Sequence, residues 1–192
     1  VKKRAALDLT DDGGCTPLHL SAERGFTEVV QCLLDARANA NATDSSGSTA
    51  VMMAAQKSHP AVVALLIDGG ATVNVEAGPG DRMGATALHF AAHKCNALVC
   101  SQLLAAGADH SKGENGRGTP LARTIMHNQS EARRVDTITV LVRAGAELGA
   151  RDGDGQVLKE NLLLWAAAYK ETRTEALVRQ ALFDPRLLSH GD

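Results

Sequence analysis

Aromatic residues are scarce in this chain. Trp, Tyr and Phe make up 3% of its 192 residues, whereas 44% of the residues are hydrophobic and 22% are charged. Large rings normally fill the middle of a thick core, so a core of small aliphatic side chains predicts thin, closely packed layers. The hydrophobic and charged fractions are ordinary for a folded protein, which argues against intrinsic disorder.

Concentrated positive charge is also missing. The formal net charge is −2, and acidic and basic residues are mixed along the chain. Without a basic stripe we expect no nucleic-acid binding, and we interpret the short basic cluster at residues 2–4 as a solvated helix end. The longest apolar run, residues 162–168, is too short to span a bilayer, and no signal-peptide pattern occurs. We therefore expect no membrane insertion.

The four cysteines form no C-x-x-C pair and no zinc-finger spacing, so we expect no structural zinc and no cofactor. Reduced, buried thiols indicate an intracellular protein, cytoplasmic or nuclear. Asp-Gly-Asp-Gly at 152–155 lacks the other acidic ligands of a calcium loop, and the glycines at 113–118 do not meet the phosphate-loop spacing. No catalytic set can be assembled from the sequence, so we expect no enzyme.

The chain repeats itself. Thr followed by a small residue or Pro, and then by an apolar residue, recurs at intervals of 33, 37 and 33 residues, at Thr16, Thr49, Thr86 and Thr119. An aliphatic pair recurs in phase with it, beginning at Leu33, Leu66, Leu103 and Leu141. An alanine does the same, at Ala38, Ala71, Ala108 and Ala146. Three markers in one register predict a row of similar units.

One unit can be built from its residues. Thr16 is a suitable helix N-cap, Pro17 suits the first helical position, and residues 18–24 predict a short first helix. A second helix presents one apolar face made of Val29, Val30, Leu33 and Leu34. Two helices this short cannot bury their own apolar faces, so each unit needs neighbours on both sides.

Residues 11–43, with Thr16-Pro17-Leu18-His19 near their start, resemble the ankyrin repeat family along their whole length. The resemblance covers residues 5–151 well and the last forty residues more loosely. It implies an all-α solenoid of helix–turn–helix units joined by β-hairpin-like connections. It also implies a protein–protein interaction module, an adaptor or scaffold, which we expect to be monomeric. The alternative is an autoregulatory or structural domain that packs against another domain of a larger parent protein.

The register predicts six segments. Residues 1–10 are the tail of a preceding repeat or an N-terminal cap, and the chain, which begins at Val1, is expected to be a fragment of something longer. The others are repeat one (11–43), repeat two with a lengthened hairpin (44–80), repeat three (81–113), repeat four (114–151) and a divergent C-terminal capping repeat (152–192). In repeat four we expect an insertion between the two helices, near residues 129–136.

Several departures from the signature have local consequences. Helix ends favour a left-handed residue, normally Gly, and Gly70, Gly107 and Gly145 fill that place in repeats two to four. Repeat one has Arg37 there, at a predicted cost of about 1 kcal/mol. Repeat two has Met52 in place of the signature histidine. Its Pro60 falls at the start of the second helix, an acceptable position.

The signature histidines, His19 and His89, are predicted to be structural. Equivalent positions of stacked helices lie about 10 Å apart, which is too far for them to share a metal ion. We therefore expect each imidazole to hydrogen-bond the backbone near its turn.

The resemblance implies that a partner lies on the concave face made of the hairpin tips and the first helices. The residues expected to bind it are Arg24, Gln56, Lys57, Arg82, Met83, His93, Lys94, Arg117, Met126 and His127. Arg and Met are favoured in interface cores, so we expect repeats three and four to form the centre of the surface. No pocket is implied, which favours a peptide or helix of another protein over a small molecule.

Overall fold

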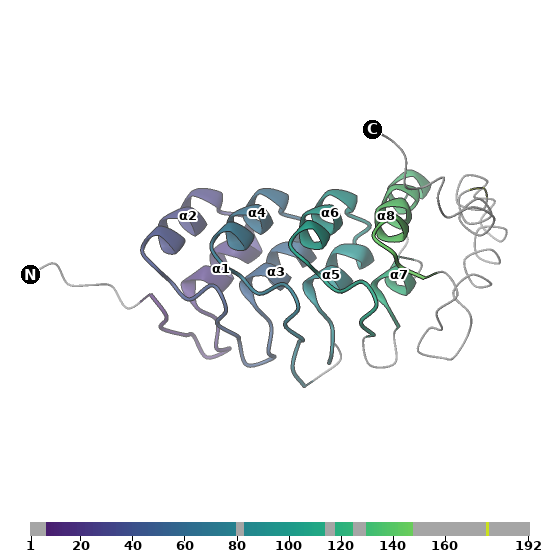
Figure 1. Cartoon of the computed structure of the whole chain (residues 1–192). Helices are drawn as coiled ribbons and strands as arrows, with labels where there is room; N and C mark the ends of the chain where they lie inside the picture. Colours follow the sequence, from purple (N-terminus) through teal and green to yellow (C-terminus); the bar gives the residue numbers. More distant parts are fainter. Residues whose placement is uncertain (1–6, 80–82, 114–117, 125–129, 148–175, 177–192) are drawn as a thin grey trace, which may run out of the picture.

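The computed structural model describes residues 7–79, 83–113, 118–124, 130–147 and 176. Within these residues the chain forms helices in pairs (Figure 1). The pairs are α1 (Pro17–Arg24) with α2 (Thr27–Asp35), α3 (Ala50–Lys57) with α4 (Pro60–Asp68), α5 (Ala87–His93) with α6 (Ala97–Ala105), and α7 (Pro120–Arg123) with α8 (Glu131–Arg143).

The helices stack in two layers. The first helices α1, α3, α5 and α7 contact one another in sequence, and the second helices α2, α4, α6 and α8 do the same. Figure 1 shows the two rows side by side, with the connecting loops projecting on the side of the first helices. No strand occurs among the described residues, where an isolated antiparallel bridge joins Thr43 and Thr49. The predicted all-α solenoid is confirmed.

Residues near its two ends determine where helix α1 begins and ends. Thr16 has extended backbone angles, and its side chain accepts a hydrogen bond from the backbone N–H of His19. Pro17 occupies the first helical position, where its missing N–H costs no hydrogen bond. Gly25, with a φ of 74°, ends the helix in the left-handed conformation. The start of α1 was predicted from these residue types.

The core is thin and aliphatic, as the lack of aromatic residues predicts. It continues through every repeat, and its leucines at the centre are almost completely buried: Leu18, Leu66, Leu88, Leu103, Leu121 and Leu141. Alanines fill the close contacts between first helices, and Ala22, Ala54, Ala55, Ala91 and Ala92 are each 0% exposed. A side chain larger than alanine at these places would separate the layers.

The backbone confirms the register at the end of the second helices. Gly70, Gly107 and Gly145 have φ values of 85°, 82° and 100°. Arg37, at the same place in repeat one, has a φ of 67°. A residue with a Cβ atom therefore occupies the left-handed region here, as the sequence predicts.

Asparagines tie successive units together. Asn41 accepts a hydrogen bond from Thr72 N at 2.7 Å and donates one to Gly70 O at 3.1 Å. Asn74, 33 residues later, accepts from Asp109 N at 2.8 Å and donates to Gly107 O at 2.9 Å. Asp8, at the equivalent place before repeat one, accepts from Asn39 N at 3.0 Å. A carboxylate has no donor, so Asp8 supplies only the accepting half of this link.

Two expectations differ from the structure. Residues 131–136 do not form an insertion between the helices of repeat four, because they belong to α8, which has 13 residues against 9 in α2. The extra length therefore extends the second helix at its start. Val29 was expected on a buried face, yet it is 48% exposed, because no helix pair lies on the outer side of α2 among the described residues.

Backbone hydrogen bonds close the connection between α4 and α5. Ala77 N donates to Ala85 O at 2.8 Å, and Gly84 N donates to Ala77 O at 3.0 Å, so the loop is closed between these residues. Residues 80–82 within it lie outside the described residues. The expected C-terminal cap, residues 152–192, also lies outside them except for Ala176.

Candidate functional site

Two carboxylates shape the first two hairpin loops. Asp44 Oδ1 accepts hydrogen bonds from Ser46 N and Ser48 N, both at 2.8 Å, and from the Ser46 hydroxyl at 2.7 Å. Asp11 Oδ1 accepts from Gly13 N and Cys15 N, both at 2.9 Å. These bonds replace solvent as the partner of the loop amides and hold each tip in one conformation.

The loops also stack directly on one another. Gly13 O accepts from Ser45 N at 3.0 Å and from the Ser45 hydroxyl at 2.7 Å, and Ser46 O accepts from Gly78 N at 2.8 Å. Gly47 has a φ of +73°, and a Cβ atom placed there would lie 2.3 Å from Gly78 N. Backbone approaches backbone here, so the tips form one continuous surface with the first helices. We call this surface, made of α1, α3, α5 and the loops at 11–15, 44–48 and 77–85, the loop-side face.

The signature histidines support the loops. His19 Nδ1 accepts from Thr16 N at 3.1 Å, so Nε2 carries the proton and donates to Ser48 O, 3.1 Å away in the next repeat. His89 Nδ1 makes the same contact with Thr86 N at 3.1 Å. Burial lowers the pKa of His89 to about 4, so its imidazole is neutral near pH 7. The predicted structural role of both histidines is confirmed.

Repeat two lacks this arrangement because Met52 stands in place of the histidine. Thr49 Oγ1 is consequently buried with no hydrogen-bond partner among the described residues. In repeats one and three the equivalent hydroxyls lie 2.9 Å from a histidine Nδ1. An unpaired buried hydroxyl destabilises a fold, whereas a paired one stabilises it modestly.

A hollow of about 170 Å³ lies on the loop-side face, across repeats one to three. The first helices and one loop tip contribute its lining, which consists of Glu23, Asp44, Ser46, Ser48, Met52, Met53, Gln56 and Phe90. Met52 and Phe90 are 2% and 4% exposed and supply apolar surface. The two carboxylates supply charge, and the hydroxyl and amide groups supply hydrogen-bonding capacity. Apolar surface combined with a few polar groups is typical of a binding site.

The charged residues that line this hollow are the two carboxylates Glu23 and Asp44. None of its lining residues is basic. Burial raises the pKa of the Cys15 thiol, and the charges of Asp11, Asp44 and Glu23 raise it further. The charges of these three carboxylates therefore act together at Cys15, on the loop-side face. Glu23 Oε1 also pairs with Lys57 Nζ at 3.1 Å, between two exposed side chains whose attraction water weakens.

The residues expected to bind a partner are distributed unevenly. Gln56 lines the hollow, and Lys57 forms an ion pair with Glu23, which also lines it. Arg24 is exposed at the end of α1, Met83 is 45% exposed in the third loop, and His93 is half-buried at the end of α5. Arg82, Arg117, Met126 and His127 lie outside the described residues.

Lys94 lines a different hollow, of about 350 Å³. Its other lining residues come from the turns of repeats two and three, from the start of α6 and from α8: Ser58, Cys95, Asn96, Ala97, Arg133 and Asp136. Arg133 and Asp136 belong to the first two turns of α8, so the start of this helix forms one wall. Lys94 and Gln56 therefore line different hollows.

Of the eight residues that line the hollow, only Gln56 was expected to bind a partner, and Asp44, Met53 and Phe90 are among those not predicted. Met53 and Phe90 each follow the signature threonine by four residues, as Leu20 does in repeat one. The recurrence of a large apolar residue four positions after the signature threonine in repeats one to three is the signal that could have identified Met53 and Phe90. Asp44 carries no such signal, because an aspartate at the start of a hairpin is fully explained by its loop bonds.

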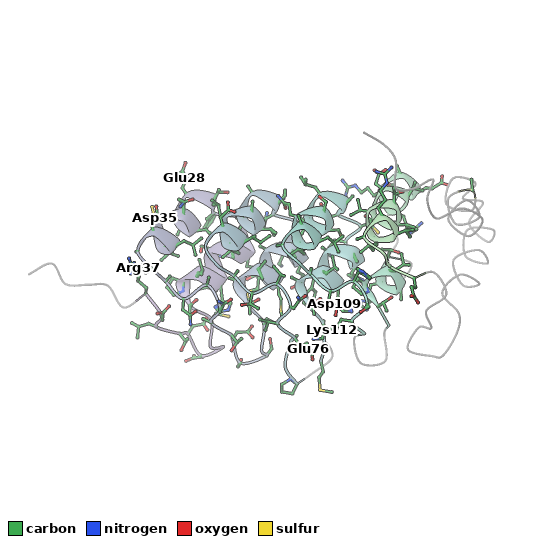
Figure 2. All side chains as sticks on the ribbon, viewed as in Figure 1. Glu28, Asp35, Arg37, Glu76, Asp109 and Lys112 are labelled. Carbon is green, nitrogen blue, oxygen red and sulfur yellow. The ribbon has the colours of Figure 1, made fainter. Side chains whose placement is uncertain are left out.

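The opposite layer has its own exposed features. Phe26 and Val29, at the start of α2, are 51% and 48% exposed, whereas Val62 and Val99, equivalent to Val29, are 1% and 0% exposed. Figure 2 shows Glu28 and Asp35 on this outer helix, while Glu76, Asp109 and Lys112 lie on the loop side. Glu76 and Lys112 form an ion pair there.

Neither a metal site nor a membrane span occurs in the described part of the chain. No three His, Cys, Asp or Glu side chains in that part are grouped so that they can hold a metal ion. No helix among the same residues has the length and apolar character needed to cross a bilayer. The hollow on the loop-side face combines apolar surface with charged and hydrogen-bonding groups, so we take it as the candidate functional site.

Comparison with known families gives two matches. A model of ankyrin repeats in three copies matches residues 1–77, and a model of a single ankyrin repeat matches residues 83–113. No curated protein matches the chain.

Proposed function

Because the chain belongs to the ankyrin repeat family, we propose that it holds a segment of another protein along its loop-side face, which the resemblance predicts to be concave. Ankyrin repeats generally mediate protein–protein interactions and are typically not catalytic. The observation that carries the proposal is the hollow on that face. Repeats that stack in one direction offer an extended surface, which suits an extended peptide or a helix better than a compact ligand.

The dimensions of the hollow favour a protein partner. Pockets for small molecules usually enclose about 300–1,000 Å³, and the hollow encloses about 170 Å³. It therefore suits one side chain of a longer segment. The row of equivalent positions along the first helices supplies further contacts on either side. Repeats three and four extend this row, and we propose that Met83 and His93 contact the same segment.

Two double variants test this function. Met53→Ser/Gln56→Ala alters the loop-side face, and Val29→Ser/Gln31→Ala makes the same kinds of change on α2. Each is used as bait beside the wild-type chain, after circular dichroism shows that it is folded, and recovered proteins are quantified by mass spectrometry. We expect the loop-side variant alone to lose the proteins that the wild type recovers. Equal recovery by that variant would show that the face does not bind them.

A second function is favoured by the exposed apolar surface on α2. Phe26 and Val29 take no part in the hollow, and burial of such residues stabilises by about 1.5–3 kcal/mol each. A neighbouring unit of a larger parent protein that covered them would make this chain a structural or autoregulatory domain. In that case the α2 variant loses recovery and the loop-side variant keeps it. Amide hydrogen exchange of α2 would also be slower in a longer polypeptide containing this chain.

A further inference from the structure

The hollow on the loop-side face has two carboxylates that are only partly used. Asp44 accepts its loop hydrogen bonds through Oδ1, and Oδ2 has no hydrogen-bond partner among the described residues. Glu23 pairs with Lys57 through Oε1, and its second oxygen is equally unengaged within them. Each carboxylate therefore offers one oxygen to a ligand while its other oxygen remains occupied.

The remaining lining of the hollow suits a long hydrocarbon chain. Met52, Met53 and Phe90 come from two successive first helices and form its apolar part. Long basic side chains bury their methylene groups against such surface and keep the charged end near polar groups. A volume of about 170 Å³ has room for about five or six water molecules, which is the scale of one side chain.

We propose that this hollow binds a single basic side chain, arginine above all, of the segment that the protein holds. The planar guanidinium presents several N–H donors in fixed directions, so it can address Glu23 and Asp44 together, while its stem lies against the methionines and Phe90. Lysine has one compact charged group and fits two separate acceptors less well. The Gln56 amide, at the same rim, orients the peptide next to that residue.

The negative charge around the hollow supports this assignment. Asp11, Asp44 and Glu23 all raise the pKa of Cys15, in addition to its burial, so their potentials overlap at this side of repeats one and two. A partner with a basic residue is attracted by this potential, and an acidic one is repelled. The proposal rests on the proposed function, because the arginine belongs to the bound segment.

The test uses capped amino acids as probes. N-acetyl-arginine methylamide is titrated into the chain at low ionic strength, and the Met52 and Met53 methyl resonances are followed by NMR. N-acetyl-citrulline methylamide has nearly the same shape but no charge. We expect saturable shifts with arginine and about tenfold weaker binding with citrulline, since charge-assisted hydrogen bonds are roughly twice as strong as neutral ones. Equal shifts with both probes would overturn the proposal.

A charge-matched pair of variants makes the test specific. Glu23→Gln/Asp44→Asn removes two negative charges at the hollow, and the amide introduced by Asp44→Asn keeps an oxygen that can hold the loop. Glu28→Gln/Asp35→Asn removes two negative charges from α2 (Figure 2). We expect arginine binding to be lost in the first variant and kept in the second. Glu23→Gln alone, which leaves the loop untouched, should weaken binding severalfold; undiminished binding in both Glu23 variants would overturn the proposal.

The two proposals fail differently. If arginine causes no shift while Met53→Ser/Gln56→Ala still loses the recovered proteins, the chain binds a segment at this face but not through a basic side chain. If arginine binds and that variant recovers everything, the hollow recognises arginine but does not hold the recovered proteins.

Discussion

Replacing Arg37 with glycine should stabilise the chain by about 1 kcal/mol. Arg37 has a φ of 67°, and its equivalents in repeats two to four are glycines with φ values of 85°, 82° and 100°. A side chain in the left-handed region costs about 1–2 kcal/mol because its Cβ approaches the following carbonyl. Glycine removes that cost. Glycine also gives the unfolded chain more conformational freedom, which offsets about 0.5–1 kcal/mol of the stabilisation. The exposed Arg37 side chain makes no ion pair within the described residues, so little else is lost.

The reverse change in repeat two tests the same reasoning. A Cβ atom added at Gly70 meets nothing within 4 Å, so Gly70→Ala isolates the backbone cost, which we expect to be about 1 kcal/mol. Ala36→Gly is the matched control beside Arg37. Ala36 has a φ of −79°, so glycine there should destabilise by about 0.5–1 kcal/mol through chain entropy alone.

Urea unfolding followed by circular dichroism measures all three variants against the wild type. The expected order of stability is Arg37→Gly, wild type, and then Ala36→Gly and Gly70→Ala together. A stabilisation of 1 kcal/mol corresponds to a rise in Tm of about 3 °C for a chain of this size. An Arg37→Gly variant that is no more stable than the wild type, with Gly70→Ala neutral, would refute the reasoning.

Four further predictions concern single residues. Thr16→Val should cost about 1–2 kcal/mol by urea unfolding because it removes the helix cap and the contact with His19. Thr49→Val should be neutral or slightly stabilising, since its hydroxyl is buried and unpaired among the described residues; equal costs would contradict this. The pKa of His89, lowered by burial to about 4, makes the unfolded chain bind more protons between about pH 6.5 and pH 4. Stability should therefore fall by up to about 3 kcal/mol as the pH falls through this range, and His89→Gln should flatten this part of the pH dependence. Gly47→Ala should destabilise by at least about 2 kcal/mol, because a Cβ atom would lie 2.3 Å from Gly78 N in a left-handed backbone; a Tm within 1–2 °C of wild type would contradict the stacking of the loops.

The sequence was sufficient wherever the structure is local. The Thr16 cap, Pro17 at the first helical position and the left-handed Arg37 each depend on a few neighbouring residues, and all three were predicted. The spacing of the repeats also determined the two-layer fold, because helices this short must stack. The exposure of Val29 was not predicted, because periodicity identifies an apolar face but does not say what covers it.

The candidate site was harder to predict because three repeats contribute to it. Glu23, Asp44 and Phe90 are far apart in sequence, and only stacking brings them to one hollow. Spacing likewise showed that repeat four has extra residues, but not that residues 131–134 lengthen α8. The number of added residues is a property of the sequence, whereas their conformation depends on the helix they join.

Site-specific photocrosslinking tests most directly whether the loop-side face holds another protein. A photoreactive residue is placed at Gln56, which lines the hollow, or at Gln31, which is exposed on α2. The two chains are irradiated in the same extract, and crosslinked peptides are identified by mass spectrometry. We expect crosslinks from position 56 to a defined segment of a partner, with a basic residue at or next to the crosslinked position. Crosslinks to that partner mainly from position 31 would contradict it.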